Sequence, residues 1–252
     1  MHAHIDHPLV VFALALLAQG LAVLAGDFLR RRTHHFRQGE RQDFATVQAA
    51  TLTLLALITG FSFSMAVTRY DQRKTLEEAE ANAIGTAYLR ADLLPGDAAP
   101  RAHDLLRKYV GERIAFYEAR DEKTADTISQ RTAGLQTDLW STVLPAASPP
   151  TPIAALVVAS MNEVINSQGY TQAAWWNRIP IGAWAMMMLM AFSCNLLVGY
   201  GGERKGHTIL FVLPLVVSVA FFLIADLDSP RGGVIRVIPQ NLEATAQSMQ
   251  PH

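Results

Sequence analysis

Cysteine is almost absent from this sequence. Cys194 is the only one among 252 residues, so no intrachain disulfide can form and cysteine usage does not identify a redox compartment. The residue lies inside a long hydrophobic stretch and is interpreted as a small core residue. A fold held together by disulfides is therefore excluded.

Catalytic patterns are also lacking. The sequence has no glycine-rich phosphate loop, no His-Glu-x-x-His metal motif and no Gly-x-Ser-x-Gly nucleophile turn. Glu77, Glu78, Glu80 and Glu118 have side chains suited to acid–base chemistry, but we expect them to lie on a solvated helix face. The sequence therefore predicts no enzyme activity, no cofactor and no metal site.

Charge is scarce and unevenly distributed. Charged residues make up 17% of the chain and hydrophobic residues 50%, whereas an average soluble domain has roughly 25% charged residues. The formal net charge is −1 and no basic stripe is present, so a nucleic-acid partner is not expected. Four stretches are nearly free of charge: 8–26, 45–68, 179–200 and 208–225.

The four stretches have the length of membrane spans. Each has about 18 to 24 residues, and at 1.5 Å per residue such a helix crosses a hydrocarbon core of about 30 Å. A chain of 252 residues has no soluble core able to bury four such helices. The sequence predicts an all-α membrane protein with four transmembrane helices and a helical extramembrane domain inserted between the second and third. The predicted parts are 8–68 (helices one and two), 69–177 (polar domain), 178–227 (helices three and four) and 228–252 (a turn and short amphipathic helix).

Basic residues in the short connections predict the orientation. The connection 30–44 is rich in arginine, and the connection 201–206 contains Arg204 and Lys205. By the positive-inside rule both connections are cytoplasmic, so the termini and the polar domain lie on the other side. Arginines such as Arg69 and Arg178 on the opposite flank oppose this assignment.

The second stretch is predicted to continue into the polar domain as one helix. No proline interrupts the chain between Phe61 and Leu94, and Gly85 is the only glycine there, so 45–94 would form a helix of about 75 Å. At 100° per residue its polar side chains fall near one line, and a polar stripe cannot face lipid. The stripe includes Thr51, Ser62, Arg69 and Arg73.

Two interpretations of this polar stripe remain open. In the first, the stripe lines an ion path in which Arg69 favours anions near the mouth. Alternatively, it forms a helix interface with hydroxyl hydrogen bonds, and Arg69 extends to the lipid headgroups.

Two further features predict helix packing. Small residues recur about four apart beyond the second stretch and permit close approach of another helix or another subunit. They are Ala79, Ala83, Gly85 and Ala87. In the third stretch, Asn195 is expected to form an interhelical hydrogen bond.

An acidic turn follows the fourth stretch. Asp226 and Asp228 lie at the negative end of a helix dipole, where a carboxylate gains nothing from it. A salt bridge to Arg231, Arg69 or Arg73 would compensate for their charge. A cation site or a permeation ring is the alternative.

Four segments carry a resemblance to a known family. They are Gly-Phe-Ser-Phe-Ser-Met at 60–65, Arg-Tyr-Asp-Gln-Arg at 69–73, the helical run 80–95, and Asp-Leu-Asp-Ser-Pro-Arg-Gly-Gly-Val-Ile-Arg at 226–236. The match extends from the second stretch to residue 240. The sequence resembles the bestrophin-like family of uncharacterised bacterial membrane proteins, which is defined as a domain of unknown function.

This resemblance implies an oligomeric channel. Bestrophins are pentameric anion channels with four membrane helices per subunit and a pore lined by the second. For this chain it implies a bacterial inner membrane, a small anion as partner, and Phe61 and Met65 as candidates for a neck. The polar stripe and the small residues beyond it both need packing partners, which predicts a homo-oligomer. The bestrophins' aromatic neck sequence and acidic calcium clasp are not found.

Orientation and function stay open at this point. Bestrophins keep their termini in the cytosol, whereas the arginines here predict that the termini and 69–177 are periplasmic. The alternative function is a non-conducting membrane scaffold or sensor that docks a partner through its polar domain.

Overall fold

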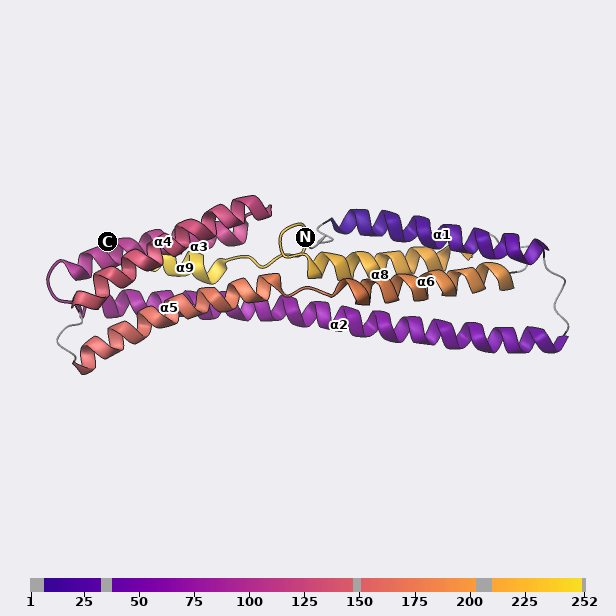
Figure 1. The fold of residues 1–252 in the computed structure, drawn as a ribbon, viewed down its shortest axis with the longest axis horizontal. Coiled ribbons are helices and arrows are strands. Elements are labelled where there is room, and N and C mark those ends of the chain that lie inside the picture. Colours follow the sequence, from indigo (N-terminus) through magenta and orange to yellow (C-terminus); the bar gives the residue numbers. More distant parts are fainter. Residues whose placement is uncertain (1–6, 33–37, 147–150, 203–209, 251–252) are drawn as a thin grey trace. The chain divides into compact units, whose positions relative to one another are not determined.

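The computed structural model describes residues 7–32, 38–146, 151–202 and 210–250, and within these ranges every regular element is an α-helix (Figure 1). The helices are α1 (Pro8–Arg32), α2 (Gln38–Ala91), α3 (Ala98–Glu118), α4 (Glu122–Ala146), α5 (Pro152–Trp176), α6 (Ile181–Gly201), α8 (Val212–Asp228) and α9 (Gln240–Ser248). The chain forms two compact units, one of residues 1–69 and 178–235 and the other of 70–177 and 236–252. The single helix α2 contributes to both.

Among the residues that the structure describes, three candidate membrane spans are found, whereas four were predicted. By length and composition they are Pro8–Arg32, Arg41–Ala91 and Pro152–Gly201, and the last contains both α5 and α6. The fourth predicted stretch corresponds to α8, which has 17 residues from Val212. Pro214 lies in its first turn, where the missing N–H removes no helix hydrogen bond.

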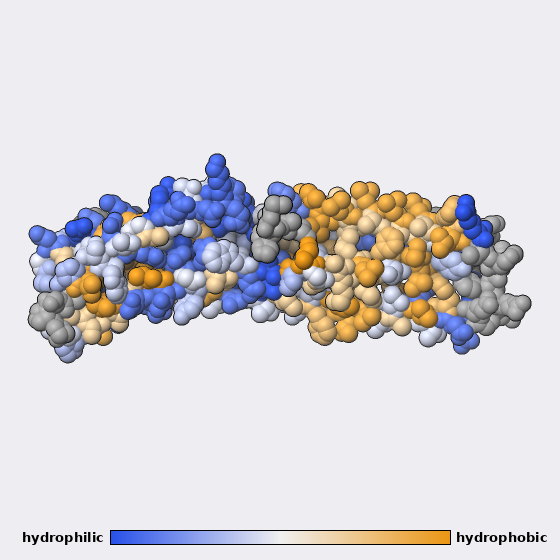
Figure 2. Space-filling view, in the orientation of Figure 1, coloured by the Kyte–Doolittle hydropathy of each residue, from blue (hydrophilic) through white to orange (hydrophobic). Residues whose placement is uncertain are grey.

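In the first unit, α1 packs along α6 and α8. Glycine permits close approach of two backbones: a Cβ on Gly26 would overlap the carbonyl oxygen of Leu196, and a Cβ on Gly199 would overlap that of Val23. Hydrophobic side chains cover the face of this unit seen in Figure 2. The close contact between α1 and α6 therefore depends on both glycines.

Three helices of this unit share a buried polar network. Asn195 Nδ2 of α6 donates to Gln19 Oε1 of α1 at 2.9 Å, and Gln19 Nε2 donates to Ser218 Oγ of α8 at 3.1 Å. All three side chains are buried. Asn195 therefore forms the interhelical hydrogen bond expected of it.

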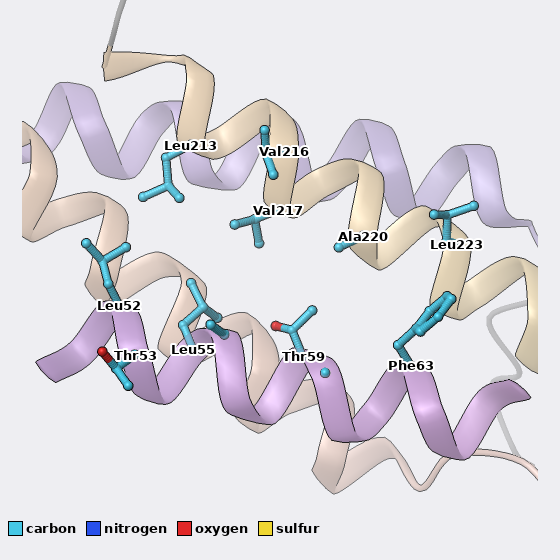
Figure 3. Close-up of a pocket in the computed structure, with 12 residues that line it drawn as sticks. Leu52, Thr53, Leu55, Thr59, Phe63, Leu213, Val216, Val217, Ala220 and Leu223 are labelled. Atoms are coloured by element: carbon cyan, nitrogen blue, oxygen red, sulfur yellow. The ribbon is translucent and has the colours of Figure 1, made fainter. Parts of the chain in front are cut away.

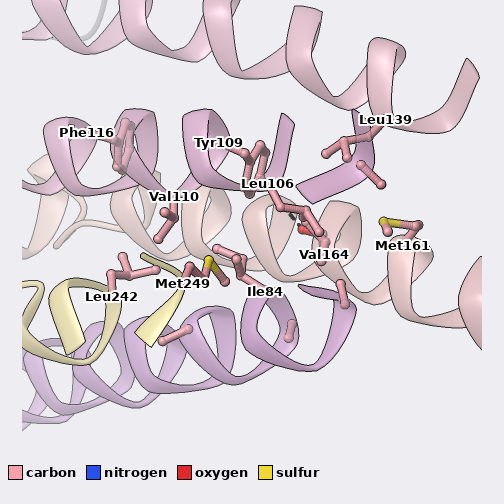
Figure 4. Packing of buried hydrophobic residues seen from close by; sticks show 14 of the residues in the cluster. Ile84, Leu106, Tyr109, Val110, Phe116, Leu139, Met161, Val164, Leu242 and Met249 are labelled. Carbon is pink, nitrogen blue, oxygen red and sulfur yellow. Dashed lines mark hydrogen bonds between the residues drawn. The ribbon is translucent and has the colours of Figure 1, made fainter. Parts of the chain in front are cut away.

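The second unit is a helical domain with its own apolar core. The C-terminal half of α2 packs with α3, α4, α5 and α9 around buried side chains (Figure 4). These include Ile84 of α2, Leu106 and Tyr109 of α3, Val164 of α5 and Leu242 of α9. The face seen in Figure 2 is mainly hydrophilic.

Local signals set the helix boundaries in this domain. Pro95 and Gly96 separate α2 from α3, and Gly96 has φ 58°, which suits glycine. Before α5, the Thr151 side chain accepts a hydrogen bond from the Ala154 N–H, and Pro152 occupies the first helical position.

The small residues of α2 divide between two neighbours. Ala83 and Ala87 are buried in the core of the second unit, whereas Gly85 faces α9, where a Cβ would lie 3.7 Å from Thr245 Cγ2. Ala79 is exposed. The predicted small-residue stem is thus largely an intramolecular contact in a single subunit.

Candidate functional site

The membrane part of α2 has one covered face and one free face. Leu55 and Ala66 are buried against the rest of the first unit. On the other side Phe61 is 66% exposed and Met65 47% exposed, with Leu54 and Leu57 also exposed. Successive residues three or four apart stand on the same side of a helix, so these four residues form a continuous apolar surface. We call Leu54, Leu57, Phe61 and Met65 the free face of α2.

The predicted polar stripe does not lie on this free face. At 100° per residue, Thr51, Ser62 and Arg69 fall within about 60° of buried Leu55 and Ala66, between them and the free face, and all three are partly covered. The Thr51 hydroxyl donates to the carbonyl oxygen of Val47 one turn back at 2.8 Å. A hydroxyl satisfied within its own helix needs neither water nor an ion.

Arg73, the fourth stripe residue, belongs to the second unit. Its side chain is buried, and Arg73 Nε donates to the carbonyl oxygen of Ala174 on α5 at 3.5 Å. Arg73 therefore contacts another helix of the same subunit.

An apolar groove runs between α2 and α8 in the first unit (Figure 3). Its volume is about 750 Å³. Leu52, Leu55 and Phe63 of α2 face Val217 and Leu223 of α8 across it. The groove contains no ionisable side chain, so it suits a hydrocarbon chain better than an ion.

Asp226 binds the backbone of the acidic turn. Its carboxylate accepts hydrogen bonds from the N–H groups of Val234 at 2.7 Å and Ile235 at 2.8 Å. A Cβ on Gly233 would overlap the carbonyl oxygen of Asp226, so the turn requires glycine there. The charge of Asp226 is thus stabilised by backbone donors.

Asp228 connects three segments of the first unit. Its two carboxylate oxygens lie 3.0 and 3.1 Å from the N–H of Ile179, just before α6. Arg69 Nη1 of α2 donates to Asp228 Oδ1 at 3.2 Å. Arg231 is buried in the same turn. Across the described ranges, no group of three or more His, Cys, Asp or Glu side chains could hold a metal ion.

Glu80 forms a buried ionic cluster that the sequence did not reveal. It pairs with Arg113 of α3, and its Oε2 accepts from Thr171 Oγ1 at 3.1 Å and from the Tyr117 hydroxyl at 3.3 Å. Arg113 also lies over the Phe116 ring, 4.5 Å from its centroid. The expectation that Glu80 is solvated is therefore wrong.

Charges in this cluster affect the nearby titratable groups. Burial, followed by the Glu80 carboxylate, raises the pKa of Tyr109 and of Tyr117. Burial alone would lower the pKa of Arg113, but the Glu80 carboxylate raises it overall. Arg113 therefore stays charged and both phenols stay protonated at neutral pH.

Glu77 is also buried, and it caps the C-terminal helix α9. Its Oε1 accepts from the N–H groups of Asn241 at 3.0 Å and Leu242 at 2.9 Å, the free donors at the start of α9. At the other end, Arg107 Nε and the Tyr88 hydroxyl donate to the carbonyl oxygen of Met249 at 2.8 and 3.2 Å. Both ends of α9 therefore contact charged groups that match its dipole.

The chain was compared with known proteins. Residues 10–242 match the family model described as the Bestrophin-like domain. A bestrophin homologue from Klebsiella pneumoniae is 16% identical, with a TM-score of 0.60 over 96% of this chain and 95% of that one. A point variant of a bestrophin homologue from the same organism is 14% identical, with a TM-score of 0.61 over 96% and 98%. No curated protein matches the chain. The family match covers most of the sequence, and the chain therefore belongs to the bestrophin-like family of membrane proteins.

Proposed function

We propose that several copies of this chain assemble in a bacterial inner membrane to form an anion channel, with α2 of each copy lining the path. The observation that carries this proposal is how little of α2 its own subunit covers. Only 11% of the apolar window of Arg41–Ala91 is buried, against 33% for Pro8–Arg32. A helix left this open is completed by lipid or by other copies of the chain.

The free face of α2 supplies a constriction for such a path. Phe61 and Met65 stand one turn apart and are both exposed. A ring of these side chains around an axis would make a narrow apolar neck, and such necks gate ion flow by losing water. In this proposal the side chains of Phe61 and Met65 contact the ion, whereas Ser62 and Thr51 lie on the neighbouring side of α2, toward its buried face.

Four helices would cross the membrane in this arrangement. At 1.5 Å per residue, the 17 residues of α8 reach about 26 Å, close to the lower limit for a span. The connections 30–44 and 201–206 would then be cytoplasmic, and the termini and the domain 69–177 periplasmic.

A non-conducting scaffold or sensor is the second candidate. Exposed apolar side chains in the second unit favour this candidate, because apolar surface in contact with water is unfavourable and a bound partner would cover it. Leu89 and Leu93 near the end of α2, and Ile153 at the start of α5, are of this kind. They would dock a partner protein outside the membrane.

Planar-bilayer recording of the purified protein separates the two candidates. We expect chloride current from the unmodified protein, and a larger current from Phe61→Ala and from Met65→Ala because each widens the neck. Leu21→Ala is the matched control, since Leu21 is an exposed apolar residue of α1. Absence of current from pure, folded protein would refute the channel and favour the scaffold.

A further inference from the structure

We propose that Asp228 sets the ion preference of this channel by holding the positive charge of Arg69. The inference rests on the proposed channel function and assigns a role to one ion pair within it. Arg69 lies one turn beyond Met65 on α2, so it follows directly after the proposed neck. A charged side chain at this place acts on any ion that enters or leaves the neck.

The pair is well shielded from solvent. The Arg69 side chain is 14% exposed and the Asp228 side chain 9%, and Nη1 of the arginine lies 3.2 Å from Oδ1 of the carboxylate. At this distance the carboxylate offsets much of the arginine charge felt by an ion several ångströms away, but does not cancel it. The anion attraction by Arg69 that one of the two sequence interpretations proposed is thus weakened by Asp228.

Asp228 keeps its position independently of Arg69. Both of its oxygens face the N–H of Ile179 at 3.0 and 3.1 Å, which ties the carboxylate to the segment before α6. Removing the arginine charge therefore makes the charge beside α2 more negative by one unit. Removing the carboxylate charge makes it more positive by one unit.

Stability alone does not account for the pair. Taking two charges out of water is costly, and apolar residues of similar size often serve a buried position as well or better. An electrostatic effect on passing ions gives the pair a role that apolar residues could not fill. The sign of the effect follows from which charge remains.

Reversal potentials in an asymmetric NaCl gradient test this role. For reconstituted full-length protein, Asp228→Asn should raise the chloride-to-sodium permeability ratio by about four- to ninefold, because one unit charge several ångströms away in water changes the permeability of each ion by about two- to threefold in opposite directions. Arg69→Gln should lower the ratio by a similar factor. The double variant, which carries neither charge, should return to the ratio of the unmodified protein.

Asp226→Asn is the matched control. It removes a buried carboxylate of the same turn, one that binds the backbone N–H groups of Val234 and Ile235. This change should lower the yield of folded protein and leave the permeability ratio of the remaining channels unchanged. A turn that merely needs its carboxylates for folding would give the same result for Asp226→Asn and Asp228→Asn.

The outcomes distinguish the two levels of the proposal. Opposite shifts in the single variants, cancelled in the double variant, support the role of Asp228. Unchanged ratios in conducting variants overturn that role and leave the channel standing. Absence of current from the unmodified protein overturns the channel, and the role of Asp228 with it.

Discussion

Replacing Glu80 by glutamine leaves the Arg113 guanidinium buried without an opposite charge. Both side chains are fully buried, so water cannot stabilise the charge that remains. Breaking a buried pair from one side costs about 3 to 5 kcal/mol. The glutamine keeps an oxygen that accepts from Tyr117 and Thr171, so the loss reports chiefly on the charge. We expect Glu80→Gln to lower the free energy of unfolding of the second unit by this amount.

Denaturant unfolding in detergent measures this loss. Fluorescence is a suitable probe because the Trp175 ring lies 5.0 Å from the Phe116 ring within the same core. Glu112→Gln is the matched control, since Glu112 pairs with Arg131 at 3.0 Å on the exposed surface, where a pair contributes less than about 1 kcal/mol. Arg113→Met should cost about as much as Glu80→Gln, and the double variant should cost less than the two singles together. Equal losses from Glu80→Gln and Glu112→Gln would refute the buried-pair reasoning.

Three other predictions follow from the packing. Gly26→Ala and Gly199→Ala should each separate α1 from α6 and reduce the yield of folded protein in detergent. Gly182→Ala, whose added Cβ meets nothing within 4 Å, should be tolerated. Equal yields from all three variants would contradict the close backbone contact. Glu77→Ala removes the cap of α9, which lowers the stability of that helix by about 1 kcal/mol, so limited proteolysis should cut the C-terminus faster. Glu78→Ala, on the exposed side of α2, should not change the rate of proteolysis. Asn195→Leu breaks the bonds to Gln19 and Ala191 and should lower the midpoint of thermal unfolding, and an unchanged midpoint would mean that the network adds no stability.

Much of the fold could be predicted because local signals decide it. The absence of proline between Phe61 and Leu94 predicts one long helix, and α2 extends from Gln38 to Ala91. Pro95 and Gly96 mark the turn that follows. A polar side chain such as Asn195 in an apolar stretch needs a hydrogen-bond partner on another helix, and it donates to Gln19 of α1.

The polar stripe shows what the sequence alone leaves open. A stripe with helical period indicates which side chains share a face, but pore-lining and packing faces have the same period. Only the neighbours decide between them. Here Leu55 and Ala66, on one flank of the stripe, are buried, whereas Phe61 and Met65, on its other flank, are exposed.

The buried glutamates could not be predicted for a related reason. Glu77, Glu78 and Glu80 lie within four positions on a helix rich in charged residues, and no local sequence pattern indicates which of them are buried. Glu80 finds its partner 33 residues away on α3, and Glu77 finds its partners 164 and 165 residues away at the start of α9. Contacts over such separations arise only when the domain folds.

Block of current by a thiol reagent tests most directly whether the free face of α2 lines the path. Cys194 is the only native cysteine and is buried in α6, so an introduced cysteine would be the one accessible thiol. A positively charged methanethiosulfonate reagent should block chloride current through Phe61→Cys and Met65→Cys channels and leave Leu21→Cys channels unaffected. Block at Ser62→Cys or Thr51→Cys, with none at Phe61→Cys and Met65→Cys, would place the path on the polar stripe and contradict the account.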